Sequence, residues 1–276
     1  MIKERVLKDV LYTLDKLTLQ FIMRNADAQS LMDKFSYETT INSQISNKKT
    51  GCHYNYYVDL ECGNSFWIGF EANWKKKETG ICFGRVEFNP AKVADSLIFQ
   101  SIFGYVLRSC GSGMLTPVRF DLAIDMPVPR DKVCLIKDKR MYSEYRNSAS
   151  DRTQYLGPRN AHGFVKLYNK ALELKLDGID LTRLELTIDY GNRSFDEVQR
   201  LIPTMYILDS YQFPLGISGT EKVIVTAILN DISLLNELGR KMGKKIKAYL
   251  SDMLMGLVLD VNKYNHVLDY IDTFKS

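Results

Sequence analysis

The sequence predicts an α+β fold: an antiparallel-rich twisted sheet with helices on one face and a polar second face, followed by a helical C-terminal region. Three segments alternate apolar and polar residues with a period of two: RFDLAID at 119–125, VKLYNK at 165–170 and RLELTI at 183–188. This period is typical of strands with one buried face. We therefore expect a sheet domain over 1–192 and a helical region over 193–276.

Elements of the N-terminal half follow from local periodicity and turn residues. In chain order we expect a helix over 4–16, a strand over 17–21, a short helix over 26–36 and three consecutive strands over 54–62, 65–74 and 80–90. Gly63 and Asn64 form the first turn of this meander. An amphipathic helix over 91–110 comes next and ends at Gly111 and Gly113.

The remaining elements are less regular. The polar stretch 140–157 is expected to hold a short edge strand around Tyr155, and the chain is expected to be helical from Ser194, apart from an interruption between Pro203 and Gly219. GRVEFN at 84–89 also resembles TRLELT at 182–187 in its order of residue types. This echo has two explanations, a duplicated half-domain or a chance match between two strands.

Composition excludes several classes of protein. The chain has 276 residues, of which 45% are hydrophobic and 25% charged, and no apolar run reaches the roughly 18 to 20 residues of a membrane span. Lys and Asp interrupt the apolar positions near the N-terminus, which argues against a secretory signal, and we expect a cytoplasmic protein with no membrane partner. The five cysteines form no CxxC pair, which argues against a disulfide framework and a zinc site.

One segment concentrates positive charge. RKMGKKIKAY has a helical pattern in which apolar residues occupy one face and basic residues the other. The basic residues are Arg240, Lys241, Lys244, Lys245 and Lys247. Two interpretations are open: a solvated helix face, or a helix that contacts DNA phosphates and supplies affinity independent of base sequence.

The polar face of the three alternating segments carries residues that suit phosphoryl chemistry. Asp121 and Glu185, with Asp125 as a third candidate, could hold a hard cation such as Mg²⁺ or Mn²⁺. Tyr168 lies between Lys166 and Lys170, and cations at those positions are expected to lower its pKa toward nucleophilic use. In the alternative explanation the acids pair with Arg119 and Arg183 and the tyrosine packs.

The order of these motifs resembles the Rep_trans family of rolling-circle replication initiators of plasmids and related mobile elements. The motifs that carry the resemblance are an Arg-x-Asp strand at 119–121, the YLG turn at 155–157, the LYNK segment at 167–170, the Arg-x-Glu strand at 183–185 and GRVEFNPAKV at 84–93. The similarity covers roughly residues 15–190. The chain lacks the paired-histidine metal motif of other rolling-circle nickases; His162 is the only histidine near the motifs.

The resemblance implies roles for individual residues. Tyr168 would nick one strand at the double-strand origin, leaving a 5′-phosphotyrosine and a free 3′-hydroxyl, and would later rejoin strands. Asp121 and Glu185 would hold Mg²⁺ or Mn²⁺, Lys170 would steady the phosphate or the leaving oxygen, and Arg183 would assist. Arg119 and Lys166, with the basic helix, would contact DNA.

Partners and rival functions follow from the same resemblance. It implies origin DNA that is single-stranded at the nick, a homodimer and a host replicative helicase. Three alternatives stay open: a conjugative relaxase of an integrative element, a catalytically silent origin-binding protein of the same fold, and a metal nuclease that activates water.

Overall fold

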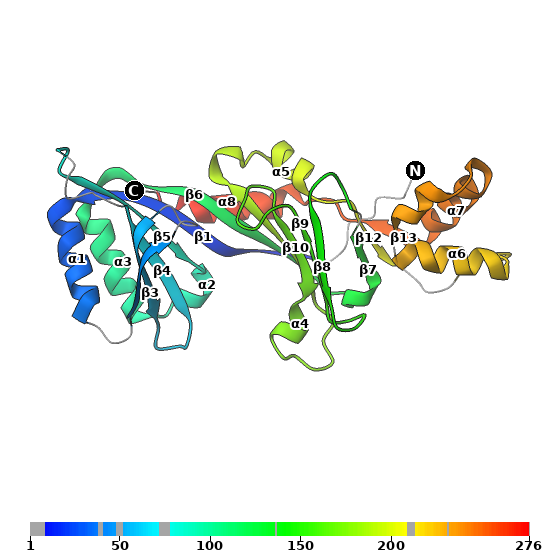
Figure 1. Ribbon diagram of the computed structural model, residues 1–276, viewed down its shortest axis with the longest axis horizontal. Helices are drawn as coiled ribbons and strands as arrows, with labels where there is room; N and C mark the ends of the chain where they lie inside the picture. Colours follow the sequence, from blue (N-terminus) through cyan, green and yellow to red (C-terminus); the bar gives the residue numbers. More distant parts are fainter. Residues whose placement is uncertain are drawn as a thin grey trace. The chain divides into compact units, whose positions relative to one another are not determined.

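A computed structural model of the chain describes residues 9–37, 41–47, 52–71, 78–135, 137–208, 213–230 and 232–275 (Figure 1). The chain divides into two compact units. The N-terminal unit comprises Leu14–Leu122, Asp189–Gly191 and Asn265–Ser276, and the C-terminal unit comprises Met1–Thr13, Ala123–Ile188 and Asn192–Tyr264. This division differs from the predicted domain boundary between residues 192 and 193. A separate functional role for 193–276 stays a prediction.

The N-terminal unit is built on an antiparallel sheet whose strands follow the order β2-β3-β4-β5-β1. Their bounds are β1 Leu11–Arg24, β2 Ile41–Asn47, β3 Cys52–Asp59, β4 Ser65–Phe70 and β5 Ile81–Phe88. The long strand β6 (Cys110–Met126) neighbours β1 and continues into the second unit. The predicted meander of three consecutive strands is thereby confirmed for β3, β4 and β5.

One face of this sheet is apolar and is covered by α1 (Asn25–Tyr37) and α3 (Leu97–Ser109) (Figure 1). The ring of Phe99 lies 5.1 Å from that of Phe66 and 4.8 Å from that of Phe88, measured between centroids. Phe35 of α1 packs on Tyr56 of β3 at 4.9 Å. Buried aromatic contacts of this kind contribute strongly to core stability. They fix α1 and α3 on this face, so the second face of the sheet is the one turned away from these helices.

The second face of the same sheet is polar. Tyr57, Trp67 and Glu87 lie in one row across β3, β4 and β5, since strand register pairs Tyr57 with Trp67 and Trp67 with Glu87. Thr18 of β1 extends this row opposite Glu87. Successive residues of a strand alternate between faces, so this row belongs to the face opposite the helices.

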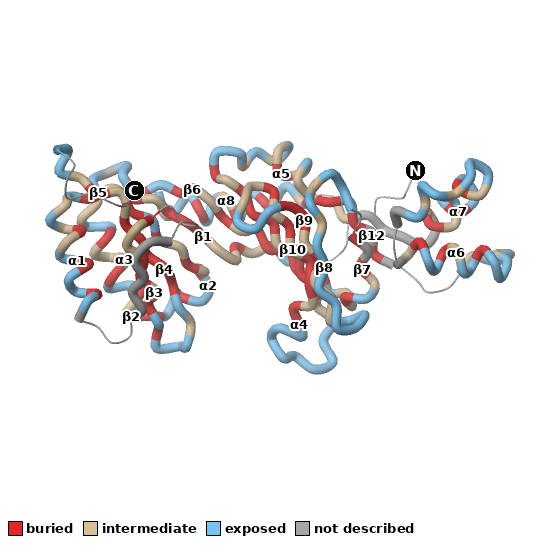
Figure 2. The backbone as a smooth tube through the Cα atoms, viewed as in Figure 1, coloured by how far each residue is buried: buried red, intermediate tan, exposed pale blue. Residues whose placement is uncertain are grey.

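The C-terminal unit contains the end of β6 and an antiparallel set in the order β11-β10-β9-β8. The bounds are β8 Tyr142–Arg146, β9 Arg152–Leu156, β10 Val165–Asn169 and β11 Thr182–Asp189, with α4 (Lys170–Glu173) between β10 and β11 and α5 (Phe195–Leu201) after them. Buried residues are most frequent in β11 and β10, and the loops of this unit are exposed (Figure 2). The predicted α+β class with an antiparallel sheet is confirmed.

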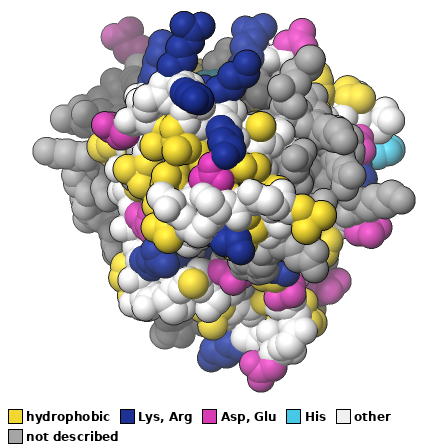
Figure 3. Space-filling model, turned by 90° about the vertical axis from the view of Figure 1, so that its right-hand side faces the viewer, with side chains coloured by type: hydrophobic (Ala, Val, Ile, Leu, Met, Phe, Trp, Pro, Cys, Tyr) yellow, Lys and Arg dark blue, Asp and Glu magenta, His cyan; other side chains and the backbone are white. Residues whose placement is uncertain are grey.

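Two helices near the C-terminus pack on each other within this unit. Ile246 and Leu250 of α7 (Arg240–Met253) join Val225 and Ile228 of α6 (Gly219–Asn230) in one buried cluster. The predicted amphipathic pattern of α7 is confirmed, and all five of its basic residues are exposed. Figure 3 shows the face that carries α6 and α7, where Lys and Arg side chains lie beside apolar ones.

The structure corrects several element predictions. Residues 11–16 belong to β1 rather than to a helix, because Tyr12 and Leu14 bury alternate positions; residues 1–8 lie outside the described residues. The helix over 91–110 is divided into α2 (Pro90–Val93) and α3, since Asn89 and Ser96 each cap a helix start. Gly111 and Gly113 lie inside β6 instead of in a loop.

Further differences concern the C-terminal unit. β9 has neighbours on both sides, β8 and β10, so the predicted edge strand around Tyr155 is wrong and β8 is the edge. In the predicted helical region, β12 (Met205–Leu208) lies within the expected interruption, whereas β13 (Leu254–Gly256) was not predicted. Both strands join β7 (Val133–Leu135) in a three-stranded sheet. After α7 the last helix is α8 (Val261–Asp272), and none of the described helices is long and apolar enough to cross a bilayer.

Candidate active site

Strands β10 and β11 place the predicted nucleophile among charged side chains. Their antiparallel register sets Tyr168 opposite Arg183 and Lys166 opposite Glu185. Because side chains two residues apart share a face, these four lie together on the polar face of the C-terminal unit, while Leu167 and Leu184 point into the core. The alternation of the sequence therefore predicted the arrangement of this pair of strands correctly.

The hydroxyl of Tyr168 is the point where the cluster converges. It donates to Glu185 Oε1 at 2.6 Å and lies 3.1 Å from Glu173 Oε2. Lys170 Nζ donates to the same hydroxyl oxygen at 3.4 Å. A phenol has one proton, so it donates to only one of the two carboxylates at a time.

Two lysines accompany this hydroxyl. Lys166 Nζ lies 3.7 Å from the centroid of the Tyr168 ring and 3.7 Å from Glu185 Oε2. Lys170, which is buried, forms an ion pair with Glu173 one helical turn later. Tyr168 thus contacts two ion pairs, Lys166–Glu185 and Lys170–Glu173, and is only 5% exposed.

The electrostatic balance at rest favours the phenol. Burial raises the pKa of Tyr168 well above its ordinary value of 10, and the negative charge of Glu185 raises it further. The expectation of a lowered pKa for Tyr168 is wrong for this arrangement, because burial and the charges of Glu185 and Glu173 dominate. For Glu173, burial acts to raise the pKa, but the hydrogen bond and charge of Lys170 hold it below its usual value.

Asp125 and Arg183 form a separate buried pair. Arg183 Nε donates to Asp125 Oδ1 and its Nη2 donates to Oδ2, both at 2.6 Å. The pair is bidentate and both residues are less than 9% exposed. The structure therefore shows the pairing alternative for Asp125 and Arg183, and a role of Asp125 as a metal ligand stays a prediction.

Arg119 and Asp121 lie on the stretch of β6 that belongs to the N-terminal unit. Arg119 Nη2 donates to Glu87 Oε2 at 2.8 Å, and Lys16 Nζ lies 3.7 Å from Asp121 Oδ2. Lys16 also approaches Glu87 Oε1 at 3.5 Å. Both residues therefore join a charged cluster of that unit, and their roles at the nicking site stay predictions.

The carboxylates that fit a divalent cation are Glu173 and Glu185, which meet at the Tyr168 hydroxyl. Across the part of the chain that the structure describes, no three acidic, histidine or cysteine side chains gather as a metal site. Mg²⁺ is commonly bound through one or two carboxylates together with substrate phosphates. Two carboxylates at one point suit such an ion, although the set differs from the three acids that the sequence predicted.

Glu173 was missed by the motif analysis. Asn169 Oδ1 accepts from the backbone N–H of Leu172 at 3.0 Å and so begins the short helix α4. This turn brings Glu173 back over Lys170, as residues three apart in a helix face each other. The signal was present as a capping Asn followed by Lys-x-x-Glu, and it depended on recognising a helical turn directly after the strand.

The remaining predicted residues are the basic residues of α7 and His162. All five basic residues of α7 are exposed, and one of them, Lys245, forms an ion pair with Glu221 of α6 within the same unit. His162 is half-buried in the loop before β10, close enough to Glu197 to lower the pKa of that carboxyl, after the larger effect of Ser194.

Comparison with known proteins places these motifs in context. No family model matches the chain. It is 25% identical over 195 residues to a replication initiation protein of Staphylococcus aureus, covering 65% of this chain and 58% of that protein. A second replication initiation protein from the same species is 26% identical over 186 residues, with 61% and 54% covered. The chain thus spans somewhat over half the length of these curated relatives.

A solved structure was also found. The rolling circle replication initiator protein from Geobacillus stearothermophilus aligns over 96% of this chain and 97% of its own, with 14% identity and a TM-score of 0.37. The sequence matches bear out the resemblance to replication initiators that was inferred from the ordered motifs.

Proposed function

We propose that this protein starts rolling-circle replication by nicking one DNA strand with Tyr168 and later rejoining strands. The observation that carries the proposal is the position of the Tyr168 hydroxyl, which contacts Glu185, Glu173 and Lys170 within 3.4 Å. A tyrosine that merely packs has no need of two carboxylates and an ammonium group at its hydroxyl. The similarity to replication initiation proteins supports the same conclusion.

The reaction is a transesterification. The Tyr168 oxygen attacks the scissile phosphorus, the bond from phosphorus to the 3′ oxygen breaks, and a 5′-phosphotyrosine and a 3′-hydroxyl result. Glu185 is the nearest acceptor for the phenol proton, at 2.6 Å. Lys170 is placed to donate to the phosphate or to the departing 3′ oxygen, which takes up a proton. Rejoining reverses these steps.

The raised pKa of Tyr168 explains why the site needs a further positive charge. A phenolate is disfavoured here by burial and by Glu185. A divalent cation such as Mg²⁺ or Mn²⁺, when bound, supplies charge that polarises the phosphate. Glu185 and Glu173 would hold it, and the role of Asp121 as a metal ligand stays a prediction from the sequence.

Recognition of the origin is assigned to other residues. Arg240, Lys241, Lys244 and Lys247 form an exposed basic face on α7 that suits DNA phosphates. Lys166 and Arg119 would add contacts to the strand, although both are engaged in ion pairs here. Origin DNA is the proposed partner, and a homodimer and a host replicative helicase belong to the same proposal.

Trapping the covalent intermediate tests the function. The full chain is incubated with Mg²⁺ or Mn²⁺ and a 3′-end-labelled pool of random-sequence single-stranded DNA, because the 5′-phosphotyrosine stays attached to the 3′ fragment. We expect a labelled band that survives SDS, and Tyr168→Phe should reduce it by at least about a thousandfold, as removal of a nucleophile does.

Tyr155→Phe is the matched control. Tyr155 lies on the neighbouring strand opposite Lys166, and its ring stacks on Phe164 at 6.0 Å. The control should keep the adduct. An adduct that persists in Tyr168→Phe would reject Tyr168 as nucleophile. Cleavage with no adduct would favour a nuclease that activates water, and binding with neither would favour a silent origin-binding protein.

A further inference from the structure

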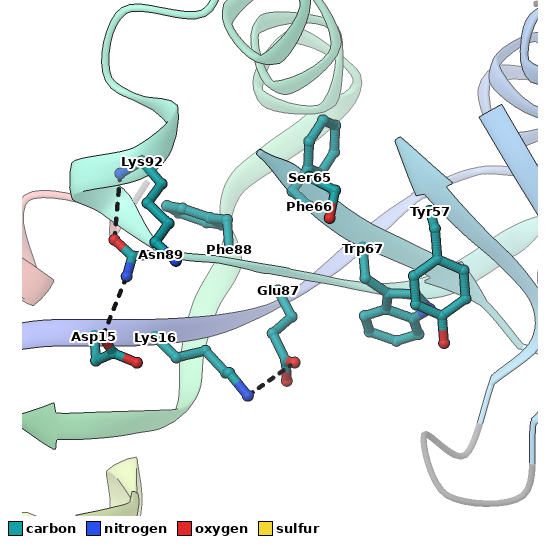
Figure 4. Close-up of a pocket in the computed structure, with 10 residues that line it drawn as sticks. All are labelled: Asp15, Lys16, Tyr57, Ser65, Phe66, Trp67, Glu87, Phe88, Asn89 and Lys92. Carbon is teal, nitrogen blue, oxygen red and sulfur yellow. Dashed lines mark hydrogen bonds and ion pairs between the residues drawn. The ribbon is translucent and has the colours of Figure 1, made fainter. Parts of the chain in front are cut away.

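The N-terminal unit contains a cavity that the proposed chemistry does not use. Its volume is about 280 Å³, and its walls come from β1, β3, β4, β5 and the start of α2 (Figure 4). Of its lining residues, Tyr57, Trp67 and Glu87 lie on the polar face of the sheet, whereas Phe66 and Phe88 belong to the face that α3 covers. Aromatic rings and charged groups line it together, which is the combination that single-stranded nucleic acid sites use.

Two aromatic side chains form one wall. Tyr57 and Trp67 are cross-strand partners on β3 and β4, and they lie next to each other in Figure 4. Trp67 Nε1 donates to Asn55 Oδ1 at 3.1 Å, and Asn55 is only 1% exposed. This buried hydrogen bond fixes the plane of the indole. Trp67 is itself only 7% exposed, so its indole backs the wall, and the half-buried phenol of Tyr57 offers the flat surface to a ring.

Donors and acceptors line the rest of the cavity. Asn89 Nδ2 donates to Asp15 Oδ1 at 3.4 Å, and Asn89 Oδ1 accepts from the backbone of Lys92. Lys16 is paired with Glu87; burial acts to lower its pKa, but Glu87 and Asp121 together raise it, so it stays charged. The cavity thus presents two cations and two carboxylates rather than one sign of charge.

Size and charge together select the ligand. Pockets for drug-sized molecules span about 300 to 1,000 Å³, so this cavity suits a single ring system and its sugar. A site for phosphate alone would be lined by cations, whereas base edges require both donors and acceptors. An unpaired base meets each of these conditions: a flat face, polar edges and a flanking backbone charge.

We propose that this cavity takes up one unpaired base of the DNA strand, stacked on Tyr57 in front of the buried Trp67, with Lys16 and Lys92 near its flanking phosphates. The choice of DNA as ligand rests on the proposed function. The site would hold single-stranded DNA through contacts that are separate from Tyr168. It makes the N-terminal unit a DNA-binding module.

Tryptophan fluorescence gives a direct readout. The sequence has two tryptophans, Trp67 and Trp74, so Trp74→Phe leaves Trp67 as the single reporter. Four homopolymeric deoxydecamers, a fully abasic decamer and the four deoxynucleoside monophosphates are titrated into the full-length Trp74→Phe protein. We expect the homopolymers to quench Trp67, the abasic decamer to leave it unchanged, and the monophosphates to act only at much higher concentration.

Substitution of Tyr57 provides a second test of the proposed base site. Tyr57→Leu should weaken decamer binding by about 5- to 150-fold, the loss that corresponds to one stacked base at 1.4 kcal/mol per tenfold. Tyr145→Leu, which removes an exposed tyrosine 57% accessible in the other unit, is the matched control and should bind as before. Equal thermal midpoints show that both variants are folded.

The outcomes separate this inference from the proposed function. Equal quenching by the abasic decamer would show a phosphate site, and equal affinity for monophosphates would show a free-nucleotide site; either result overturns the proposal, as does no quenching at all. If Trp67 is quenched while no SDS-stable adduct ever forms, the cavity inference stands and the nicking function fails. If adducts form while Tyr57→Leu binds normally, the reverse holds.

Discussion

The strand pair β4–β5 and the strand pair β10–β11 carry the same Arg-x-Glu motif with different neighbours. In the C-terminal unit, Arg183 lies opposite Tyr168. In the N-terminal unit, the corresponding Arg85 lies opposite Gly69. The place of the proposed nucleophile is therefore taken by a residue with no side chain. The Arg-x-Glu motif therefore does not define the proposed nicking site by itself, because the residue on the facing strand differs between the two units.

The second position of the motif shows the same contrast. Glu185 faces Lys166 and accepts from the Tyr168 hydroxyl, a group that can lose its proton. Glu87 faces Trp67 and accepts from Thr18 at 3.1 Å and Arg119 at 2.8 Å. The matching registers are what a duplicated half-domain would produce, and duplication stays a hypothesis. In the proposed division of roles, one copy would cut DNA and the other would hold it.

The largest expected difference between the two units concerns their arginine and carboxylate pairs. Arg183→Met should lower the free energy of unfolding by about 3 to 5 kcal/mol, because it leaves Asp125 buried without its partner. Arg119→Met should cost about 1 kcal/mol or less, since the Arg119 and Glu87 side chains are 24% and 25% exposed. Urea denaturation at pH 7 measures both.

Equal losses in the two variants would contradict this ranking. They would mean that the pair between Arg183 and Asp125 is no more desolvated in solution than the pair between Arg119 and Glu87. The slope of unfolding free energy against urea must be the same in both variants for the comparison to hold.

Gly69 occupies the position that corresponds to Tyr168, and its substitution should have a smaller effect on stability. A Cβ atom at Gly69 would lie 2.3 Å from Trp67 Cζ2 and 2.9 Å from Cys52 Cβ. Gly69→Ala should therefore destabilise the protein by about 1 to 3 kcal/mol through overpacking. Gly191→Ala is the control, because a methyl group at that position would have no atom within 4 Å, and it should change stability by less than about 0.5 kcal/mol.

The Gly69 result also bears on the cavity. A methyl group there must displace the Trp67 indole, so the fluorescence maximum of Trp67 should shift in Gly69→Ala measured in the Trp74→Phe protein. An unchanged spectrum with unchanged stability would show that the indole is not held in place by its contacts with β4.

Much of the candidate site could be predicted from local sequence. Period-two alternation placed Tyr168, Lys166 and Glu185 on one face, and the structure confirms it. The pairing of Asp125 with Arg183 could not be predicted. Several acids and arginines share one face of the sheet, and the sequence does not show which acid each arginine contacts. The predicted direction of the Tyr168 pKa was wrong for a related reason: the sequence shows the lysines beside Tyr168, but neither its burial nor the carboxylates at its hydroxyl.

Local sequence also predicts the fold only in part. Long periodic segments such as β11 were predicted, whereas β12 and β13, with four and three residues, are too short to show a period. In β1, Lys16 and Asp15 interrupt the apolar pattern at a spacing that also fits a helix, and pairing with β5 decides in favour of a strand. Tertiary context overrides local preference at such positions.

The smallest predicted effect depends on pH and isolates Tyr168. Its folded-state pKa lies above the unfolded value of about 10, so below pH 9 both states keep the phenol proton and the residue adds no pH dependence. Above pH 10 the unfolded chain releases this proton while the folded protein keeps it. The unfolded state then binds fewer protons, and the free energy of unfolding falls by up to about 1.4 kcal/mol per pH unit.

Tyr168→Phe removes this contribution and no other titrating group. The difference in unfolding free energy between the variant and the wild type, measured by urea denaturation, should be constant from pH 7 to 9. Between pH 10 and 11 it should then move by about 1 kcal/mol in favour of the variant. Parallel curves over the whole range would mean that the phenol ionises as easily in the folded protein as in the unfolded chain. The burial of Tyr168 and its contact with Glu185 would then not describe the resting site, and the need for a cation to assist the nucleophile would lose its physical basis.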